Sequence, residues 1–286
     1  MKIICGKLKL NINIEDKWKI PKNVVKFMDG KVSEDILYKV QFVENFNNDN
    51  EIIKFKREDL VVTENNKCLE SRYFRIPGFS YPYAVYREED ERNISIYIHK
   101  DFDGNFTLDS LFWSLFSLER HMIKKESIIL HCSYIVYKDK AILFSGPSGI
   151  GKSTQANLWE KYNKAKIING DRALLVKGYN GWYVYGWPMC GSSKICLNEK
   201  NKLGAIVFLG KSEENQILKL GKIDIIKNII SQTTINYWNE DFVSKAITLI
   251  DNIANNIDVY KLVCTPDINA VNILENKLME NEMWIL

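Results

Sequence analysis

Short apolar segments alternate with polar turns over the first 106 residues. Residues 7–14 and 94–98 alternate apolar and polar side chains with a period of two, which is typical of half-buried β-strands. Polar connections rich in Asn and Asp, such as residues 44–51, separate the apolar segments. The pattern predicts a β-rich N-terminal domain over residues 1–106.

A helical spacing follows this region. Residues 108–123 carry apolar side chains three and four positions apart, among them Leu111, Leu115 and Leu118. Side chains at this spacing share one face of a helix and pack that face on a core. We therefore expect residues 107–126 to form a helix that links the two halves of the chain.

From residue 127 the pattern changes to strand, loop, helix and strand, which favours a mixed α/β domain over residues 127–286. Strands are predicted at residues 127–137, 141–144, 165–168, 173–177, 181–185, 205–209 and 257–263. Helices are predicted at residues 153–162, 222–237 and 241–254. A last helix should begin near Pro266, with Thr265 as its N-cap. The fold class is thus mixed α/β, preceded by a smaller β-rich domain.

A phosphate-binding motif lies between the strand at 141–144 and the helix at 153–162. Residues 146–153 read GPSGIGKS and fit G-x-x-x-x-G-K-[ST] in full. In such a loop the backbone amides turn toward phosphate oxygens, and the helix adds its positive dipole end. Lys152 should reach the β- and γ-phosphates, and Ser153 should ligate Mg²⁺. The predicted nucleotide-binding residues are Gly146, Ser148, Gly149, Ile150, Gly151, Lys152, Ser153 and Thr154.

A carboxylate for the metal is expected at the end of the next strand. Residues 165–168 are followed by Asn169, Gly170, Asp171 and Arg172. If this strand runs parallel to residues 141–144, its carboxyl end lies near the phosphate loop. Asp171 would then join Ser153 as a magnesium ligand. Arg172 is a candidate for stabilising phosphate charge, and a surface salt bridge is the alternative.

One of the three histidines can be placed by counting along a hairpin. If Lys138 and Asp139 form a two-residue turn, Tyr137 pairs with Lys140, and His131 comes to lie opposite Gly146. A neutral imidazole there could accept a proton from an attacking hydroxyl. The alternative is a hydrogen-bonded structural histidine.

A turn-rich loop over residues 186–194 could hold a substrate. Its hydroxyls, backbone amides and one cation make Gly191, Ser192, Ser193 and Lys194 candidate substrate contacts. A long connection without function is an equal alternative.

Composition excludes several classes of function. The chain has 39 Lys and Arg against 36 Asp and Glu, a net charge of +3 over 286 residues, so nucleic-acid or membrane binding has no electrostatic support. No apolar run approaches the roughly 18 residues of a membrane span, and no signal peptide is evident. The six cysteines match no zinc or redox spacing, which indicates reduced, mostly buried thiols in a cytoplasmic protein.

Residues 127–209 resemble the catalytic half of the HPr kinase/phosphorylase family. The resemblance is carried by Leu130-His131-Cys132, by the phosphate loop and by residues 168–172, INGDR. It implies a nucleotide fold shared with phosphoenolpyruvate carboxykinase rather than with eukaryotic protein kinases. It also implies ATP and Mg²⁺ as cofactors and transfer of phosphate to a seryl hydroxyl. The acceptor is a carrier protein in that family and a small peptide in related enzymes of peptide-tailoring gene clusters.

The chain departs from this family at one position. HPr kinases end the acidic strand with two consecutive aspartates, the first linked to general base work and the second to magnesium. Here Gly170 takes the first place and Asp171 the second. The metal role carries over, whereas the base role would have to pass to His131 or Asp171. The family's carrier-protein-binding signature is not recognisable either.

These observations predict an ATP-dependent, Mg²⁺-requiring kinase that acts on a serine of a peptide or protein. Its catalytic residues would be His131, Lys152, Asp171 and Arg172, and residues 1–106 would recognise the substrate or a partner. Two alternatives stay open: a nucleotide-binding regulatory or peptide-recognition module without phosphoryl transfer, and a kinase of a small metabolite. Homo-oligomer formation is open as well.

Overall fold

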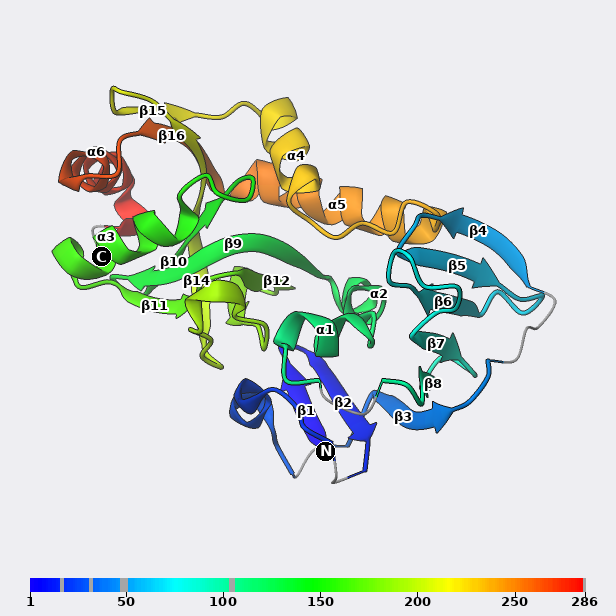
Figure 1. Ribbon diagram of the computed structural model, residues 1–286. Coiled ribbons are helices and arrows are strands. Elements are labelled where there is room, and N and C mark those ends of the chain that lie inside the picture. Colours follow the sequence, from blue (N-terminus) through cyan, green and yellow to red (C-terminus); the bar gives the residue numbers. More distant parts are fainter. Residues whose placement is uncertain (16–17, 31–32, 47–50, 103–105, 285–286) are drawn as a thin grey trace. The chain divides into compact units, whose positions relative to one another are not determined.

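The computed structural model describes residues 1–15, 18–30, 33–46, 51–102 and 106–284. The chain forms two compact units, Met1–His121 and Met122–Leu286, which we call the first and second unit. Among the described residues, each unit contains one eight-stranded sheet (Figure 1). A mixed α/β fold with a β-rich N-terminal region is therefore confirmed.

The sheet of the first unit has the strand order β1-β2-β3-β8-β7-β6-β5-β4, so β4 is an edge strand. The β2–β3 and β3–β8 pairs are parallel and the other pairs are antiparallel. In β2, buried Leu8, Leu10 and Ile12 alternate with more exposed residues, as the period of two predicts. The elements are β1 (Lys2–Cys5), β2 (Leu8–Asn13), a 3-10 helix (Lys22–Phe27), β3 (Ile36–Val43), β4 (Ile52–Lys56), β5 (Leu60–Glu64), β6 (Glu70–Phe74), β7 (Ala84–Glu88) and β8 (Asn93–His99).

The single helix expected over residues 107–126 is wrong. The chain instead forms α1 (Asp109–Ser114), α2 (Leu118–Met122) and a 3-10 turn (Ile123–Lys125). The break lies at Ser117, whose φ of 47° is left-handed. The Tyr38 hydroxyl, from β3, donates to the Phe116 carbonyl at 2.8 Å, so a carbonyl freed by the break is hydrogen-bonded. Packing on the sheet thus overrides the helical pattern.

Charged side chains lie inside the first unit. Arg72, on β6, is 4% exposed, and its guanidinium lies 2.5 Å from both Glu70 and Glu119. Arg120 pairs with Glu88, on β7, and lies 3.2 Å from Glu70. Each buried charge therefore has a partner of opposite sign, and the pairs attach α2 to β6 and β7.

The second unit has helices on both faces of its sheet. Apolar side chains of α4 and α5 pack on one face, and those of α3 and α6 pack on the other. Within β10, Ala141 and Leu143 belong to the core on the side of α4 and α5. Ile142 and Phe144 belong to the core on the side of α3 and α6. The elements are β9 (Ser127–Tyr137), β10 (Lys140–Ser145), α3 (Lys152–Asn163), β11 (Lys166–Asn169), β12 (Arg172–Gly178), β13 (Gly181–Gly186), a 3-10 turn (Gly191–Ser193), β14 (Lys200–Lys211), β15 (Gln216–Lys219), α4 (Lys222–Ser231), α5 (Glu240–Asn256), β16 (Asp258–Cys264), α6 (Ile268–Met279) and a 3-10 turn (Glu282–Trp284).

Two predicted helix boundaries are corrected by the structure. Helix α4 ends at Ser231 rather than at residue 237, because the following residues return to β9, where Thr233 forms a bridge with Leu130. The N-cap of α6 is Asp267 rather than Thr265, since the Asp267 carboxylate accepts from two backbone amides of the first turn. Strand β15 has no counterpart among the predicted elements.

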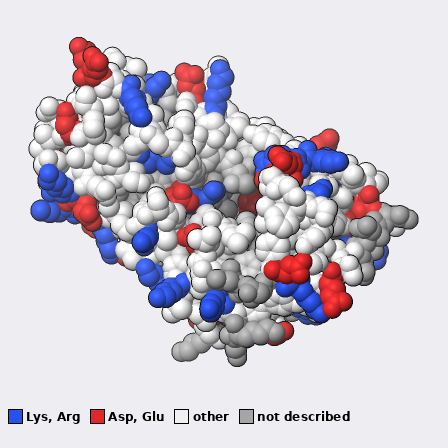
Figure 2. All heavy atoms as spheres, viewed as in Figure 1, with Lys and Arg blue, Asp and Glu red and all other residues white. Residues whose placement is uncertain are grey.

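Charge is dispersed over the surface. Figure 2 shows Lys and Arg side chains lying among Asp and Glu side chains on the face in view. Within the described residues, no helix is both long and apolar enough to cross a membrane.

Candidate active site

The phosphate loop connects β10 to α3. Gly146, Gly149 and Gly151 have φ values of 139°, 75° and 116°. Residues other than glycine rarely adopt this region of backbone conformation. Gly151 is the N-cap of α3, and no side chain of the described residues caps this helix. The first amides of α3 are therefore available to an anion at the loop.

Lys152 is held inside this loop. Its side chain is 8% exposed, and Nζ donates to the carbonyls of Gly146 at 2.9 Å and Pro147 at 3.1 Å. Burial lowers the pKa of Lys152. The ammonium group is thus positioned by neutral carbonyls.

The predicted hairpin register is confirmed. Lys138 and Asp139 both have positive φ, as a type I′ turn requires. The pairs run from Lys140 with Tyr137 to Ser145 with Cys132, so His131 is the next residue of β9 beside the start of the loop.

Asp171 also lies near the start of the phosphate loop, because it follows β11, which pairs with the edge of β9 opposite to β10. Both β10 and β11 are antiparallel to β9, so they run parallel to each other with β9 between them. Strand β12 then continues along β9, pairing Arg172 with His131, and the Cys132 amide donates to the Asp171 carbonyl at 3.0 Å. The turn that carries Asp171 therefore lies beside the middle of β9, where the phosphate loop leaves β10.

Asn169 fixes this turn. Its side chain is fully buried, and Nδ2 donates to the carbonyls of Trp187 at 2.7 Å and Met189 at 3.1 Å. Its Oδ1 accepts from the amides of Asp171 at 2.8 Å and Arg172 at 3.0 Å. One amide side chain thus ties the acidic turn to the loop after β13.

His131 and Asp171 face each other without touching. His131 Nε2 lies 3.8 Å from Asp171 Oδ1, and Nδ1 lies 3.3 Å from Gln232 Oε1. Because an amide oxygen only accepts, the Gln232 contact favours the tautomer in which Nδ1 carries the proton and Nε2 presents a lone pair. Burial, together with the charge of Lys152, lowers the pKa of His131. The imidazole is therefore neutral near pH 7.

The 191–194 loop packs on the acidic turn. A Cβ on Gly170 would lie 2.2 Å from Ser193 Oγ, and a Cβ on Gly191 would lie 3.0 Å from Asp171. The Ser193 hydroxyl donates to the Cys190 carbonyl at 2.7 Å, which holds it over Gly170. The space of a side chain at position 170 is therefore filled by Ser193.

Two cavities adjoin the phosphate loop and share Gly149, Gly151 and Thr154. The first has a volume of about 310 Å³, and its wall includes most of the residues predicted for chemistry and phosphate binding. The wall residues are His131, Ser148, Gly149, Gly151, Lys152, Ser153, Thr154, Gly170, Asp171 and Ser192. The second has a volume of about 400 Å³ and is lined by Ile150, Gln155, residues 209–212, Cys264 and Pro266.

Residues 95–265 match the sequence model of a family described as SynChlorMet cassette protein ScmC. The chain belongs to this family. The matched range contains β9 to β16, and hence the phosphate loop, His131, Asp171 and the 191–194 loop.

Other comparisons add a distant match. No curated protein matches the sequence. A solved structure described as the Hpr(Ser) kinase/phosphatase from Coxiella burnetii is 14% identical, with a match that covers 54% of this ScmC-family chain and 90% of that chain at a TM-score of 0.32.

Six predicted residues of this ScmC-family site do not line the first cavity: Gly146, Ile150, Arg172, Gly191, Ser193 and Lys194. Of these, Ile150 lines the second cavity. Arg172 Nε lies 3.3 Å from Asp171 Oδ2, which favours the ion-pair interpretation. Lys194 is exposed and lies outside the cavity wall, whereas Ser192 is part of it.

Sequence reasoning missed three polar contributors. Asn169 could have been noticed as a polar residue at the end of an apolar strand. Gln232 reaches His131 across about a hundred positions, and Gln155 lies inside α3, so local patterns give no sign of either.

Proposed function

We propose that this chain is an ATP-dependent, Mg²⁺-requiring kinase that transfers the γ-phosphate to a serine hydroxyl of a peptide or protein. One observation carries the proposal: the phosphate loop, Lys152, Asp171 and His131 line a single cavity. The motif resemblance to HPr kinases, which spans the same residues, supports the same reaction.

The two adjoining cavities fit the two parts of a nucleotide. The loop amides and Lys152 would hold the phosphates in the first cavity. The second cavity, with Leu209 and Ile150 in its wall, would hold the nucleoside. Gln155 is 3% exposed, and its Oε1 has no hydrogen-bond partner within the described residues, so it is a candidate acceptor at this end.

The residues present fit a magnesium ion. No group of three or more His, Cys, Asp or Glu side chains in the described residues is arranged to hold a metal. Mg²⁺ often takes only one or two protein oxygens and completes its shell with phosphate and water. Ser153 and Asp171, which share the first cavity, would hold it, and the ion when bound would neutralise phosphate charge.

His131 would serve as the base. The serine Oγ attacks the γ-phosphorus, its proton passes to the lone pair on Nε2, and the bond to the β–γ bridging oxygen breaks. The Nδ1 contact to Gln232 keeps the imidazole in the tautomer that this step requires. Asp171 would then act on the metal alone.

Transfer from labelled ATP tests this function. The protein would be incubated with Mg²⁺ and peptides encoded in the same cassette, and label on peptide serine is the expected result. Lys152→Ala should reduce transfer by roughly 10²–10³-fold, whereas Lys161→Ala, at an exposed position of the same helix, should retain it. The enzyme assignment is wrong if wild type turns over no ATP and Lys152→Ala behaves identically.

A regulatory module that binds nucleotide without transferring phosphate is the second candidate. It is favoured by Ser193, whose hydroxyl fills the place of the family's first aspartate over Gly170. This candidate predicts saturable nucleotide binding in calorimetry with no labelled product. Free serine and hydroxy acids, added as acceptors, would reveal a small-metabolite kinase instead.

A further inference from the structure

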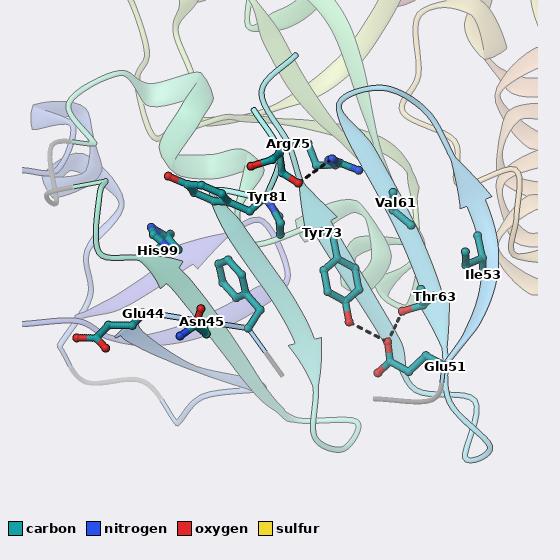
Figure 3. Close-up of a pocket in the computed structure, with 13 residues that line it drawn as sticks. Glu44, Asn45, Glu51, Ile53, Val61, Thr63, Tyr73, Arg75, Tyr81 and His99 are labelled. Atoms are coloured by element: carbon teal, nitrogen blue, oxygen red, sulfur yellow. Dashed lines mark hydrogen bonds between the residues drawn. The ribbon is translucent and has the colours of Figure 1, made fainter. Parts of the chain in front are cut away.

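A cavity of about 690 Å³ lies in the first unit (Figure 3). Apolar side chains from β4 and β5, Ile53 and Val61, form one wall. Aromatic side chains, Phe46, Tyr73 and Tyr81, form much of the rest. The volume is far larger than one water site and suits several side chains of a ligand.

Glu51 provides an anionic group in this cavity. Its carboxylate accepts from three hydroxyls: those of Thr63, of Ser71 at 3.0 Å, and of Tyr73 at 3.3 Å. Within the described residues Glu51 has no ion-pair partner. Burial, followed by the charge of Glu51, raises the pKa of Tyr73. The carboxylate is thus fixed in position by neutral donors, and its charge is left uncompensated.

The aromatic wall adds attraction for a cation. The rings of Tyr81 and His99 lie 4.4 Å apart, and Phe46 lies 6.0 Å from His99. The Tyr81 hydroxyl donates to Asp101 at 2.6 Å, which fixes that ring. Ring faces of Tyr and Phe attract ammonium and guanidinium groups. The aliphatic stem of a Lys or Arg side chain would meanwhile pack on Ile53 and Val61.

Arg75 gives the cavity a second, opposite charge. Figure 3 shows it at the other end of the cavity from Glu51, and its guanidinium donates to the Ser80 carbonyl at 3.3 Å. Glu44, also in the wall, is already paired with Lys100. The two charges left for a ligand are therefore Glu51 and Arg75.

The adjoining sheet edge favours a peptide over a small molecule. Strand β4 ends the sheet, and Ile52 and Ile53 on it are 70% and 60% exposed. Edge strands bind extended peptides through main-chain hydrogen bonds, while neighbouring pockets select side chains.

We infer that this cavity binds an extended peptide segment, with a Lys or Arg side chain at Glu51 and an acidic side chain at Arg75. The inference depends on the proposed function only for the role of the bound peptide as a kinase substrate. Peptide binding in this cavity itself requires neither nucleotide nor phosphoryl transfer.

Anisotropy of fluorescein-labelled octapeptides, measured on the full chain without nucleotide, tests the inference. One library position would be lysine, arginine, citrulline or norleucine, and a second would be glutamate or glutamine. Wild type should bind lysine or arginine roughly tenfold more tightly than citrulline or norleucine, as a charge-assisted hydrogen bond implies. Glutamate should be preferred over glutamine at the second position.

Two variants and two controls complete the experiment. Glu51→Gln should lose the preference for a cation, whereas Glu64→Gln, on β5 and paired with Lys54, should keep it. Ile53→Lys, at an exposed position, should weaken binding of basic peptides even if Glu51→Gln folds poorly. Binding that ignores charge, unchanged preference in Glu51→Gln, or no binding of any peptide would overturn the inference. Lys152→Ala should bind these peptides as wild type does. Failure of the kinase assignment can therefore be distinguished from failure of the peptide-binding inference.

Discussion

The two units place their charged side chains differently. In the first unit Arg72, Glu70 and Glu88 lie inside the fold, and each is paired with another protein charge. In the second unit the sheet is covered by apolar side chains on both faces, and Lys152 is held by backbone carbonyls. Charges in the first unit's interior are therefore paired with each other, whereas the ammonium group in the phosphate loop is held by neutral groups.

The largest expected effect concerns Arg72. Arg72→Met leaves Glu70 and Glu119 without this partner, and breaking a buried ion pair costs about 3–5 kcal/mol of unfolding free energy. Arg57→Met, which removes an exposed pair with Asp59, should cost about 0.5 kcal/mol or less. Urea unfolding measures both. Equal losses of unfolding free energy in the two variants would show that the buried network contributes no more to stability than a surface pair.

Removing the Lys152 ammonium should lower activity and leave stability unchanged. Lys152→Met should reduce phosphoryl transfer by roughly 10²–10³-fold, the usual cost of losing one group that stabilises developing charge. Its unfolding free energy should not fall, because a desolvated ammonium is removed that forms no ion pair within the described part of the chain. Kinetics and urea unfolding on the same preparation test the contrast, which fails if stability falls as far as in Arg72→Met.

Gly170 offers a test of packing at the site. Gly170→Ala places Cβ 2.2 Å from Ser193 Oγ, and such overpacking costs roughly 1–3 kcal/mol. Ser193→Gly should relieve the clash, so the double variant should be more stable than Gly170→Ala alone. Thermal unfolding of the four proteins completes the cycle, and simple additivity would mean that the two residues do not compete for space.

The smallest expected effect is a pH dependence in the first unit. Burial opposes ionisation of Glu88, but the hydrogen bond and charge of Arg120, together with the Glu70 amide and His121, outweigh burial and hold the Glu88 pKa below its usual range. Its contribution to stability is therefore full above the unfolded pKa and is lost as pH falls through the folded one. Urea unfolding between pH 6 and about 3 should show a steeper acid loss for wild type than for Glu88→Gln. Parallel curves would contradict this.

The local sequence pattern was sufficient to predict part of the structure of the second unit. The Lys138-Asp139 turn and the alternation around it set the hairpin register, and that register placed His131 beside the phosphate loop. The strand ending at Asn169 likewise indicated where Asp171 would lie. These features depend on residues close in the chain, where turn chemistry and periodicity decide the structure.

Other features depend on contacts distant in sequence. Ser117 adopts a left-handed φ although nothing in its neighbourhood signals a break. Gln232 reaches His131 only because the chain leaves α4 to pair with β9. Glu51 meets Ser71 across the sheet of the first unit. No sequence pattern reports such pairings, because they are selected by tertiary packing.

The Ser193 side chain over Gly170 also restricts the order in which substitutions can be made. An aspartate at position 170 would collide with it, so two consecutive aspartates at positions 170 and 171 require a change in the 191–194 loop first.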